Sequence, residues 1–178
     1  MPKVLTSLSF ALLLLLSLLV GCNYRSANQG QRLYGKYFSA ESPIGYQTLR
    51  AVGAAQLDDE ASILEQGKRY HQQQDYDMAL VSFRAYLESN PEPASFLPEL
   101  LAGTSAMASG YYDEARDYFE RLPTNVSEAD GAALWYLSLL DLRDENIDAA
   151  RGKLEVLAKS AARNQYPVRD VLQQLSAK

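Results

Sequence analysis

The sequence predicts an all-α protein that is built from consecutive helical hairpins. The first observation is the segment 63–91, where two short amphipathic helices flank a turn and a proline ends the unit. The second is a recurrence, because three such segments carry alanine at matching places, 79, 115 and 150, which are 36 and 35 residues apart. The third is the final segment 165–178, whose apolar residues share one helix face.

The first hairpin carries the most specific pattern. Its first helix contains Gly67 and Tyr70, its second contains Ala79 and Phe83, and Pro91 ends the unit. The pattern G-x2-Y, then A-x3-F, then P resembles the tetratricopeptide repeat (TPR), a helical hairpin of about 34 residues. Such a unit buries its apolar face only against neighbouring units, so the resemblance implies that further hairpins follow.

Two further units show the same pattern with substitutions. The second unit keeps three signature residues: Gly103, Ala115 and Phe119. Ala106 stands where the first unit has Tyr70. The third unit keeps Ala150, while Ser138 and Asp141 replace its glycine and tyrosine. The resemblance therefore covers residues 60–178 and implies a TPR-like solenoid of about three repeats.

Local signals place the ends of several helices in this domain. Ser127, with Asp130 three residues later, indicates a helix start, and Pro98 suits the first turn of another helix. In the segment 165–178, four apolar residues recur at i, i+3, i+4 and i+7: Val168, Val171, Leu172 and Leu175. We expect this segment to form a C-terminal capping helix that covers the last repeat.

The N-terminus has the features of a lipoprotein signal peptide. The apolar run 8–20 follows Lys3 and is shorter than the roughly 20 residues of a membrane-spanning helix. It ends in Leu-Val-Gly before Cys22, which resembles the bacterial lipobox. The resemblance implies removal of residues 1–21 and a diacylglyceryl group on Cys22, with N-acylation, commonly palmitate, on its new amino group. An ordinary signal peptide with a chance cysteine, or an uncleaved anchor, is the alternative.

Charge and the residues after Cys22 bear on location. Asn23, rather than aspartate, favours the outer membrane of a Gram-negative bacterium by resemblance, and the absence of an acidic run after Cys22 favours the periplasmic face. The formal net charge of −5, without a basic block, argues against nucleic-acid binding.

Residues 22–59 are predicted to form a tether. The polar stretch 23–32 is typical of a flexible spacer. Four aromatic residues follow it closely: Tyr34, Tyr37, Phe38 and Tyr46. We expect this aromatic segment to pack along the flank of the first hairpin; the alternative is a docking peptide for a partner. If it folds across the groove of the repeats, it would inhibit partner binding in cis.

No catalytic constellation is present in the sequence. The chain has one cysteine and one histidine, and it lacks a Gly-rich phosphate loop and a G-x-S-x-G elbow. The acidic run 58–60 is explained by the start of a helix rather than by calcium binding. We therefore predict a non-enzyme without a metal or cofactor.

The resemblance to TPR domains implies a concave groove lined by the first helix of each hairpin. It assigns eight residues to this groove: Leu64, Lys68, His71, Thr104, Met107, Trp135, Leu139 and Arg143. For Trp135, burial between helices is the alternative. The resulting hypothesis is a membrane-anchored scaffold that binds an envelope protein or peptide. The alternative function is a ligand-binding accessory lipoprotein for a transporter or an envelope assembly machine.

Overall fold

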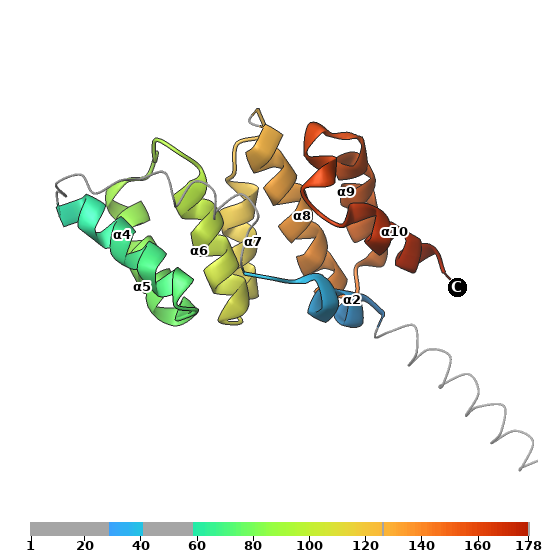
Figure 1. Cartoon of the computed structure of the whole chain (residues 1–178), viewed down its shortest axis with the longest axis horizontal. Helices are drawn as coiled ribbons and strands as arrows, with labels where there is room; N and C mark the ends of the chain where they lie inside the picture. The colour runs from blue at the N-terminus through green and yellow to red at the C-terminus, as the bar shows by residue number, and fades with distance from the viewer. Residues whose placement is uncertain (1–28, 41–58, 126, 178) are drawn as a thin grey trace, which may run out of the picture.

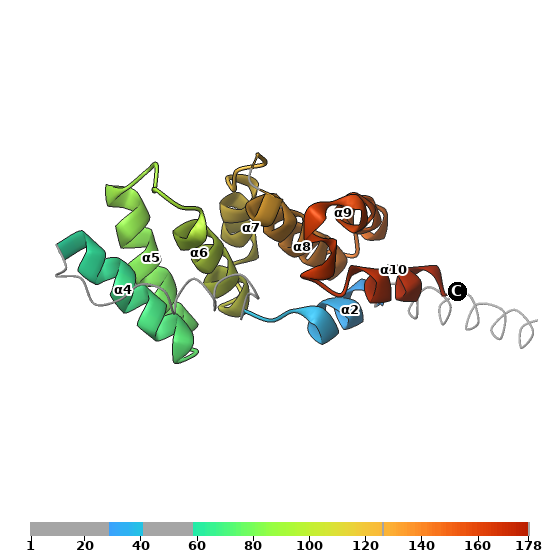
Figure 2. The same ribbon diagram turned by 45° about the horizontal axis from the view of Figure 1, so that its top comes forward.

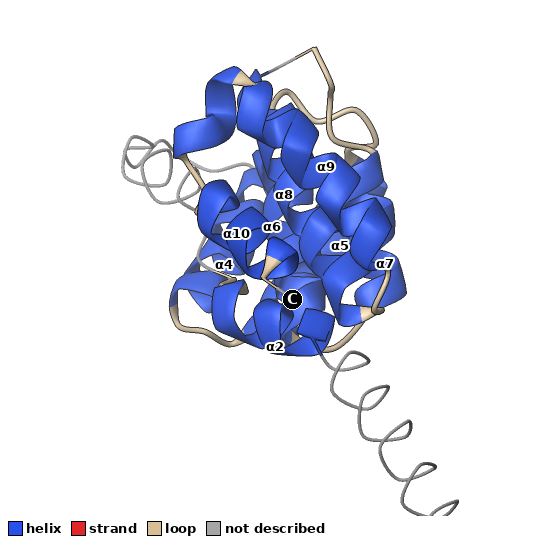
Figure 3. Cartoon of the chain, turned by 90° about the vertical axis from the view of Figure 1, so that its right-hand side faces the viewer, coloured by secondary structure: helices blue, strands red, loops and turns tan. Residues whose placement is uncertain are grey.

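Three helical hairpins follow one another along the chain (Figure 1). The computed structural model describes residues 29–40, 59–125 and 127–177, and within these ranges every regular element is a helix (Figure 3). The prediction of an all-α fold is confirmed for this part of the chain. The hairpins are α4 (Asp59–Gln72) with α5 (Tyr76–Ser89), α6 (Leu97–Ala108) with α7 (Tyr112–Glu120), and α8 (Ser127–Arg143) with α9 (Ile147–Lys159).

The hairpins stack side by side, because α5 packs against α6 and α7 packs against α8 (Figures 1 and 2). After α9, the 3-10 helix η1 (Ala161–Asn164) packs on α8 and α9, and α10 (Val168–Ser176) packs on α9. The first described helix, α2 (Gln29–Tyr37), lies on α8, beside α10 (Figure 2). None of the described helices has the length and apolar character that crossing a membrane requires.

Capping and proline chemistry place several helix ends, and the sequence predicts two of them, at Pro98 and Ser127. The side chain of Asp75 accepts a hydrogen bond of 3.3 Å from the backbone N–H of Met78 at the start of α5. Pro98 lies in the first turn of α6, where no backbone donor is needed. Helix α8 begins at Ser127, as predicted.

All three hairpins turn through the same backbone pattern. In each turn one residue has a positive φ: Gln74 (61°), Gly110 (84°) and Glu145 (59°). The N–H of the next residue then donates to the carbonyl five residues earlier, in the bonds Asp75 to Tyr70, Tyr111 to Ala106 and Asn146 to Asp141, at 2.8–2.9 Å. The positive-φ residues are 36 and 35 residues apart, the same spacing as the matched alanines. The three units therefore share one turn geometry at the spacing of the aligned alanines.

A glycine of the first helix contacts a phenylalanine of the second helix in two hairpins. A Cβ atom added to Gly67 would lie 2.9 Å from Cε1 of Phe83, and one added to Gly103 would lie 2.6 Å from Cε1 of Phe119. Both phenylalanines are fully buried. The ring thus occupies space that any larger residue would need, which explains the pairing of a small and a large residue in the sequence.

The third hairpin uses a different set of contacts. Ser138, in the place of the glycine, is buried and its hydroxyl donates to the carbonyl of Trp135 at 2.7 Å. Asp141, in the place of the tyrosine, is also buried and accepts from Arg116 at 3.1 Å and from Lys153 at 2.5 Å. These ion pairs connect α7, α8 and α9, because each helix supplies one of the charges.

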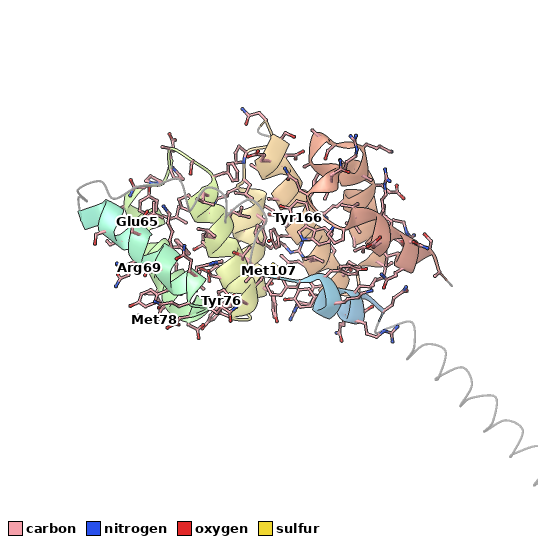
Figure 4. All side chains as sticks on the ribbon, viewed as in Figure 1. Glu65, Arg69, Tyr76, Met78, Met107 and Tyr166 are labelled. Atoms are coloured by element: carbon pink, nitrogen blue, oxygen red, sulfur yellow. The ribbon has the colours of Figure 1, made fainter. Side chains whose placement is uncertain are left out.

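The C-terminal helix has the amphipathic form that was predicted. Val168, Val171 and Leu175 are buried, and Leu172 is partly buried against the core. The preceding Tyr166, which is labelled in Figure 4, stacks on Trp135 with 5.1 Å between ring centroids. The end of the described core is therefore closed by aromatic and aliphatic side chains from outside the three hairpins.

Candidate partner-binding surface

Most residues that were assigned to an open groove are buried. Six of the eight are less than a tenth exposed: Lys68, His71, Thr104, Met107, Trp135 and Leu139. Helix α6 buries every residue from 100 to 107, which include Met107 (Figure 4). These six residues do not line an open surface. The four on α6 and α8 lie on helices that are covered on more than one side, and His71 on α4 contacts Thr104 of α6 and Phe83 of α5.

The buried polar residues among them have partners within the fold. The Nε2 atom of His71 lies 3.2 Å from the hydroxyl of Thr104, and the ammonium group of Lys68 lies 2.6 Å from the carboxylate of Glu65. Leu64 and Arg143 are partly exposed. Trp135 was assigned either to the groove or to the space between helices. It is buried in the core, because the residue is only 3% exposed.

Helix α2 occupies the surface of the third hairpin. Leu33 is buried against the core, and Tyr34 stacks on Phe38 while its ring edge meets Tyr112. The chain is therefore helical from Gln29, and the expectation of a flexible spacer across residues 23–32 is wrong over its last four residues. The expected packing against the first hairpin is also corrected, because α2 packs on α8.

Hydrogen bonds hold both ends of α2. At its start, the carboxylate of Glu145 accepts from the backbone N–H groups of Gly30 at 3.2 Å and Gln31 at 3.1 Å. A carboxylate in this position satisfies free amides and complements the helix dipole. At its end, the side chain of Gln174 on α10 accepts from Lys36 at 3.2 Å and donates to the hydroxyl of Tyr37.

Gly30 is the point of closest approach between α2 and the hairpin. A Cβ atom at this position would lie 2.0 Å from the carbonyl oxygen of Leu142 and 3.1 Å from Cδ1 of Ile147. Only a residue without a side chain fits there. We call the surface beneath α2 the α2 socket; it is formed by Tyr112, Tyr136, Leu142, Arg143, Glu145, Ile147 and Gln174.

A cavity that is largely open to solvent borders the α2 socket. A cavity of about 520 Å³ remains beside α2, lined by Gln31, Tyr34, Tyr112, Arg143, Asp144 and Glu145. The guanidinium of Arg143 lies over the ring of Tyr112, 3.4 Å from its centroid. Burial, and then the neighbouring Tyr112, raise the pKa of Tyr34 above its ordinary value, so its hydroxyl stays protonated.

A second cavity, of about 450 Å³, lies between α5 and α7. Arg84 on its wall donates two hydrogen bonds to Glu114, at 2.7 and 2.5 Å, and Tyr118 donates to the same carboxylate at 3.1 Å. Burial and the Glu114 charge raise the pKa of Tyr118 to about 12. Because these groups already bind one another, the cavity offers few free donors or acceptors to a ligand.

The part of the chain that the structure describes offers no candidate metal centre. No group of three His, Cys, Asp or Glu side chains is placed there to hold a metal ion. Residues 1–21 and Cys22 lie outside the described residues, as do Tyr46 and Asp58 of the predicted tether. Searches of protein-family models, of curated proteins and of solved structures found no match to this chain.

The sequence reasoning missed helix α2, although a signal for it exists. Gly30, Leu33, Tyr34, Tyr37 and Phe38 follow the spacing i, i+3, i+4, i+7 and i+8, which is typical of one helix face. The polar residues between them obscured this pattern. The α2 socket is the candidate partner-binding surface, since it already binds a helix.

Proposed function

We propose that this chain is a lipid-anchored tetratricopeptide-repeat protein that works as an interaction scaffold at the periplasmic face of a bacterial outer membrane. It performs no catalysis and carries no cofactor besides the lipid on Cys22. Its partner is a protein of the cell envelope that binds the repeat domain while the lipid holds that domain at the membrane.

The observation that carries this proposal is the repeated hairpin. The positive-φ turn and the following backbone hydrogen bond recur at intervals of 36 and 35 residues. The pairing of a first-helix glycine with a second-helix phenylalanine recurs in the first two hairpins. A period near 34 residues, with a small residue facing a large one, is the signature of TPR units. Such arrays present extended surfaces to other proteins.

The spacing between Cys22 and α2 supports a location close to the membrane. Seven residue steps separate Cys22 from Gln29, where α2 begins. A fully extended chain of that length reaches at most about 25 Å. An acylated Cys22 would therefore hold the α8–α10 end of the domain near the lipid headgroups whenever α2 is docked.

Metabolic labelling tests the anchor. Cells that express the wild-type chain or Cys22→Ser would be supplied with a palmitate analogue and then fractionated. We expect label and outer-membrane sedimentation for the wild type only, because the thiol of Cys22 is the acceptor of the diacylglyceryl group. An unlabelled wild-type chain in the soluble periplasm would refute the anchor.

Crosslinking in intact cells tests the scaffold. Val81 on α5 and Val156 on α9 are exposed apolar residues, 54% and 56% exposed, and they are suitable sites for a photo-crosslinking amino acid. We expect a discrete crosslinked protein with at least one of them in the wild-type background and a weaker product with Cys22→Ser. If neither position yields a protein adduct, the ligand-binding alternative becomes preferable.

A further inference from the structure

The described part of α2 behaves as a bound peptide ligand. It has nine residues, and isolated helices shorter than about 12–15 residues are marginal in water. Its contacts with α8, with the carboxylate of Glu145 and with Gln174 stabilise its helical state. Only Gly30 and Leu33 are buried within it, whereas Gln31, Arg32, Gly35 and Lys36 are exposed. The anchoring residues recur at i, i+3, i+4, i+7 and i+8, which is how helices bind in protein grooves.

The α2 socket contains a carboxylate that is placed to accept from the first described amides of a docked helix. Glu145 has φ 59°, a left-handed conformation that costs a non-glycine residue about 1 kcal/mol or more. The equivalent residues are Gly110 in the second hairpin and Gln74, with φ 61°, in the first, so the positive φ belongs to the shared turn. What distinguishes Glu145 is the use of its side chain. Glu145 uses its side chain to accept from the first amides of α2, 115 and 114 residues away. Its position therefore serves the recognition of a helix N-terminus.

The fit between α2 and the α2 socket is incomplete. The cavity of about 520 Å³ beside Gln31 and Tyr34 is space that α2 leaves open. A helix with a larger side chain at the position of Gln31 would fill that cavity and would contact Tyr112 and Arg143, which line it. The α2 socket therefore leaves room beside the position of Gln31 for a larger side chain.

From these observations we propose that the α2 socket is the docking site for a helix of the partner protein, and that α2 occupies it as an exchangeable ligand in cis. This inference rests on the proposed scaffold function. The partner helix has a free N-terminal turn, a glycine at the close approach to Leu142, apolar or aromatic residues three, four and seven positions later, and a large side chain next to the glycine.

Exchange also changes how far the domain reaches from the membrane. With α2 docked, the chain from Cys22 to Gln29 spans at most about 25 Å. With α2 released, the next described helix begins at Asp59, 37 residue steps from Cys22, which corresponds to at most about 130 Å. Partner binding at the α2 socket would therefore release the domain from the membrane surface.

Peptide binding tests the exchange, with the full chain purified in detergent. A fluorescent peptide of residues 28–40 is titrated into wild type, Gly30→Leu and Gly35→Leu. Gly30→Leu expels α2 in cis by collision with the carbonyl of Leu142, whereas a Cβ at Gly35 meets nothing within 4 Å. We expect at least ten-fold tighter peptide binding to Gly30→Leu than to wild type, because a tethered competitor acts at an effective concentration near the millimolar range. Gly35→Leu should match wild type.

Two peptide variants make the test specific. A peptide that carries Gly30→Leu should not bind any of the three chains, because the collision now lies on the peptide. A peptide that carries Gln31→Tyr should bind Gly30→Leu several-fold more tightly than the native peptide does, because the tyrosine enters the open cavity. Weaker binding of the Gln31→Tyr peptide would overturn the proposal that the α2 socket suits a larger partner helix.

Hydrogen exchange on the unmodified chain provides a measurement that does not depend on how the variants fold. If α2 exchanges as a unit, its amides should show protection at least 100-fold below those of α8. Equal protection in α2 and α8, or equal peptide affinity for wild type and a folded Gly30→Leu, would overturn the proposal. Neither measurement depends on the lipid, so failure of the palmitate labelling would remove the anchor and leave the α2 socket untouched.

Discussion

Replacement of Gly103 by alanine tests the close packing within the second hairpin. The new Cβ atom would lie 2.6 and 2.7 Å from Cε1 and Cζ of Phe119, well below ordinary carbon–carbon contact. Phe119 cannot move aside easily, because it is fully buried and stacks on Tyr136 with 4.9 Å between centroids. The helix backbone or both rings must therefore shift.

Two opposing terms set the size of the effect. Alanine is favoured over glycine inside a helix by about 1 kcal/mol. Overpacking of a core costs about 1–3 kcal/mol, and the stacked rings place this site in the upper part of that range. We expect a net loss of about 1–2 kcal/mol in the free energy of unfolding for Gly103→Ala.

Urea denaturation of matched variants measures this difference. Gly152→Ala on α9 is the control, since a Cβ there meets nothing within 4 Å. It should gain about 0.5–1 kcal/mol from helix propensity alone. Gly67→Ala, with a closest approach of 2.9 Å, should fall between wild type and Gly103→Ala. Equal stability of Gly103→Ala and Gly152→Ala would refute the packing argument.

Further substitutions test the turns and the charges. Gly110→Ala should lose about 1 kcal/mol in thermal or urea unfolding, because φ 84° strains any residue with a Cβ atom; no loss would contradict the turn geometry. Asp141→Ala should lose about 2–3 kcal/mol, less than a fully buried pair, because its two cations are about 30% exposed and can turn to water. Hydrogen bonds from Arg84 lower the pKa of Glu114, so its carboxylate stabilises the fold above its ordinary pKa, and this contribution is lost as the pH falls through the lowered value. Glu114→Gln should therefore be less stable than wild type at pH 7, with a difference that shrinks below about pH 4. Burial raises the pKa of Glu99, so Glu99→Gln should instead be more stable than wild type at pH 7 and equal to it in acid. Urea unfolding curves at about pH 3.5 and about pH 7, on either side of the ordinary glutamate pKa, measure the sign of the stability change for both variants.

The sequence predicts the hairpins well because their signals are local. Asp75 and Ser127 mark helix starts, and Ala79 and Ala115 fall at the same place in the turn-to-helix register that the structure shows. Each signal acts within about one helical turn of its own residue, through capping, backbone strain or 3.6-residue periodicity. Such features are readable without knowledge of the tertiary neighbours.

The candidate site was not predictable in the same way. Trp135 and Leu139 lie on α8 and were assigned to the open groove, but other parts of the chain cover both residues. Periodicity shows that a face is apolar, and it does not show which segment covers it. The cap that Glu145 provides for α2 joins residues 115 positions apart, and no local pattern encodes that pairing.

What the sequence alone determined is the all-α class, the helical hairpins between 59 and 159 and the amphipathic form of the last helix, but not the 3-10 helix η1. The tertiary structure decided where α2 lies, which residues of α6 and α8 are buried, and that Gly30 must be glycine. The physical reason is the range of the interactions. Hydrogen bonds within a helix and its turns join near neighbours, whereas the burial of a nine-residue helix depends on a surface that exists only once the third hairpin and α10 have assembled.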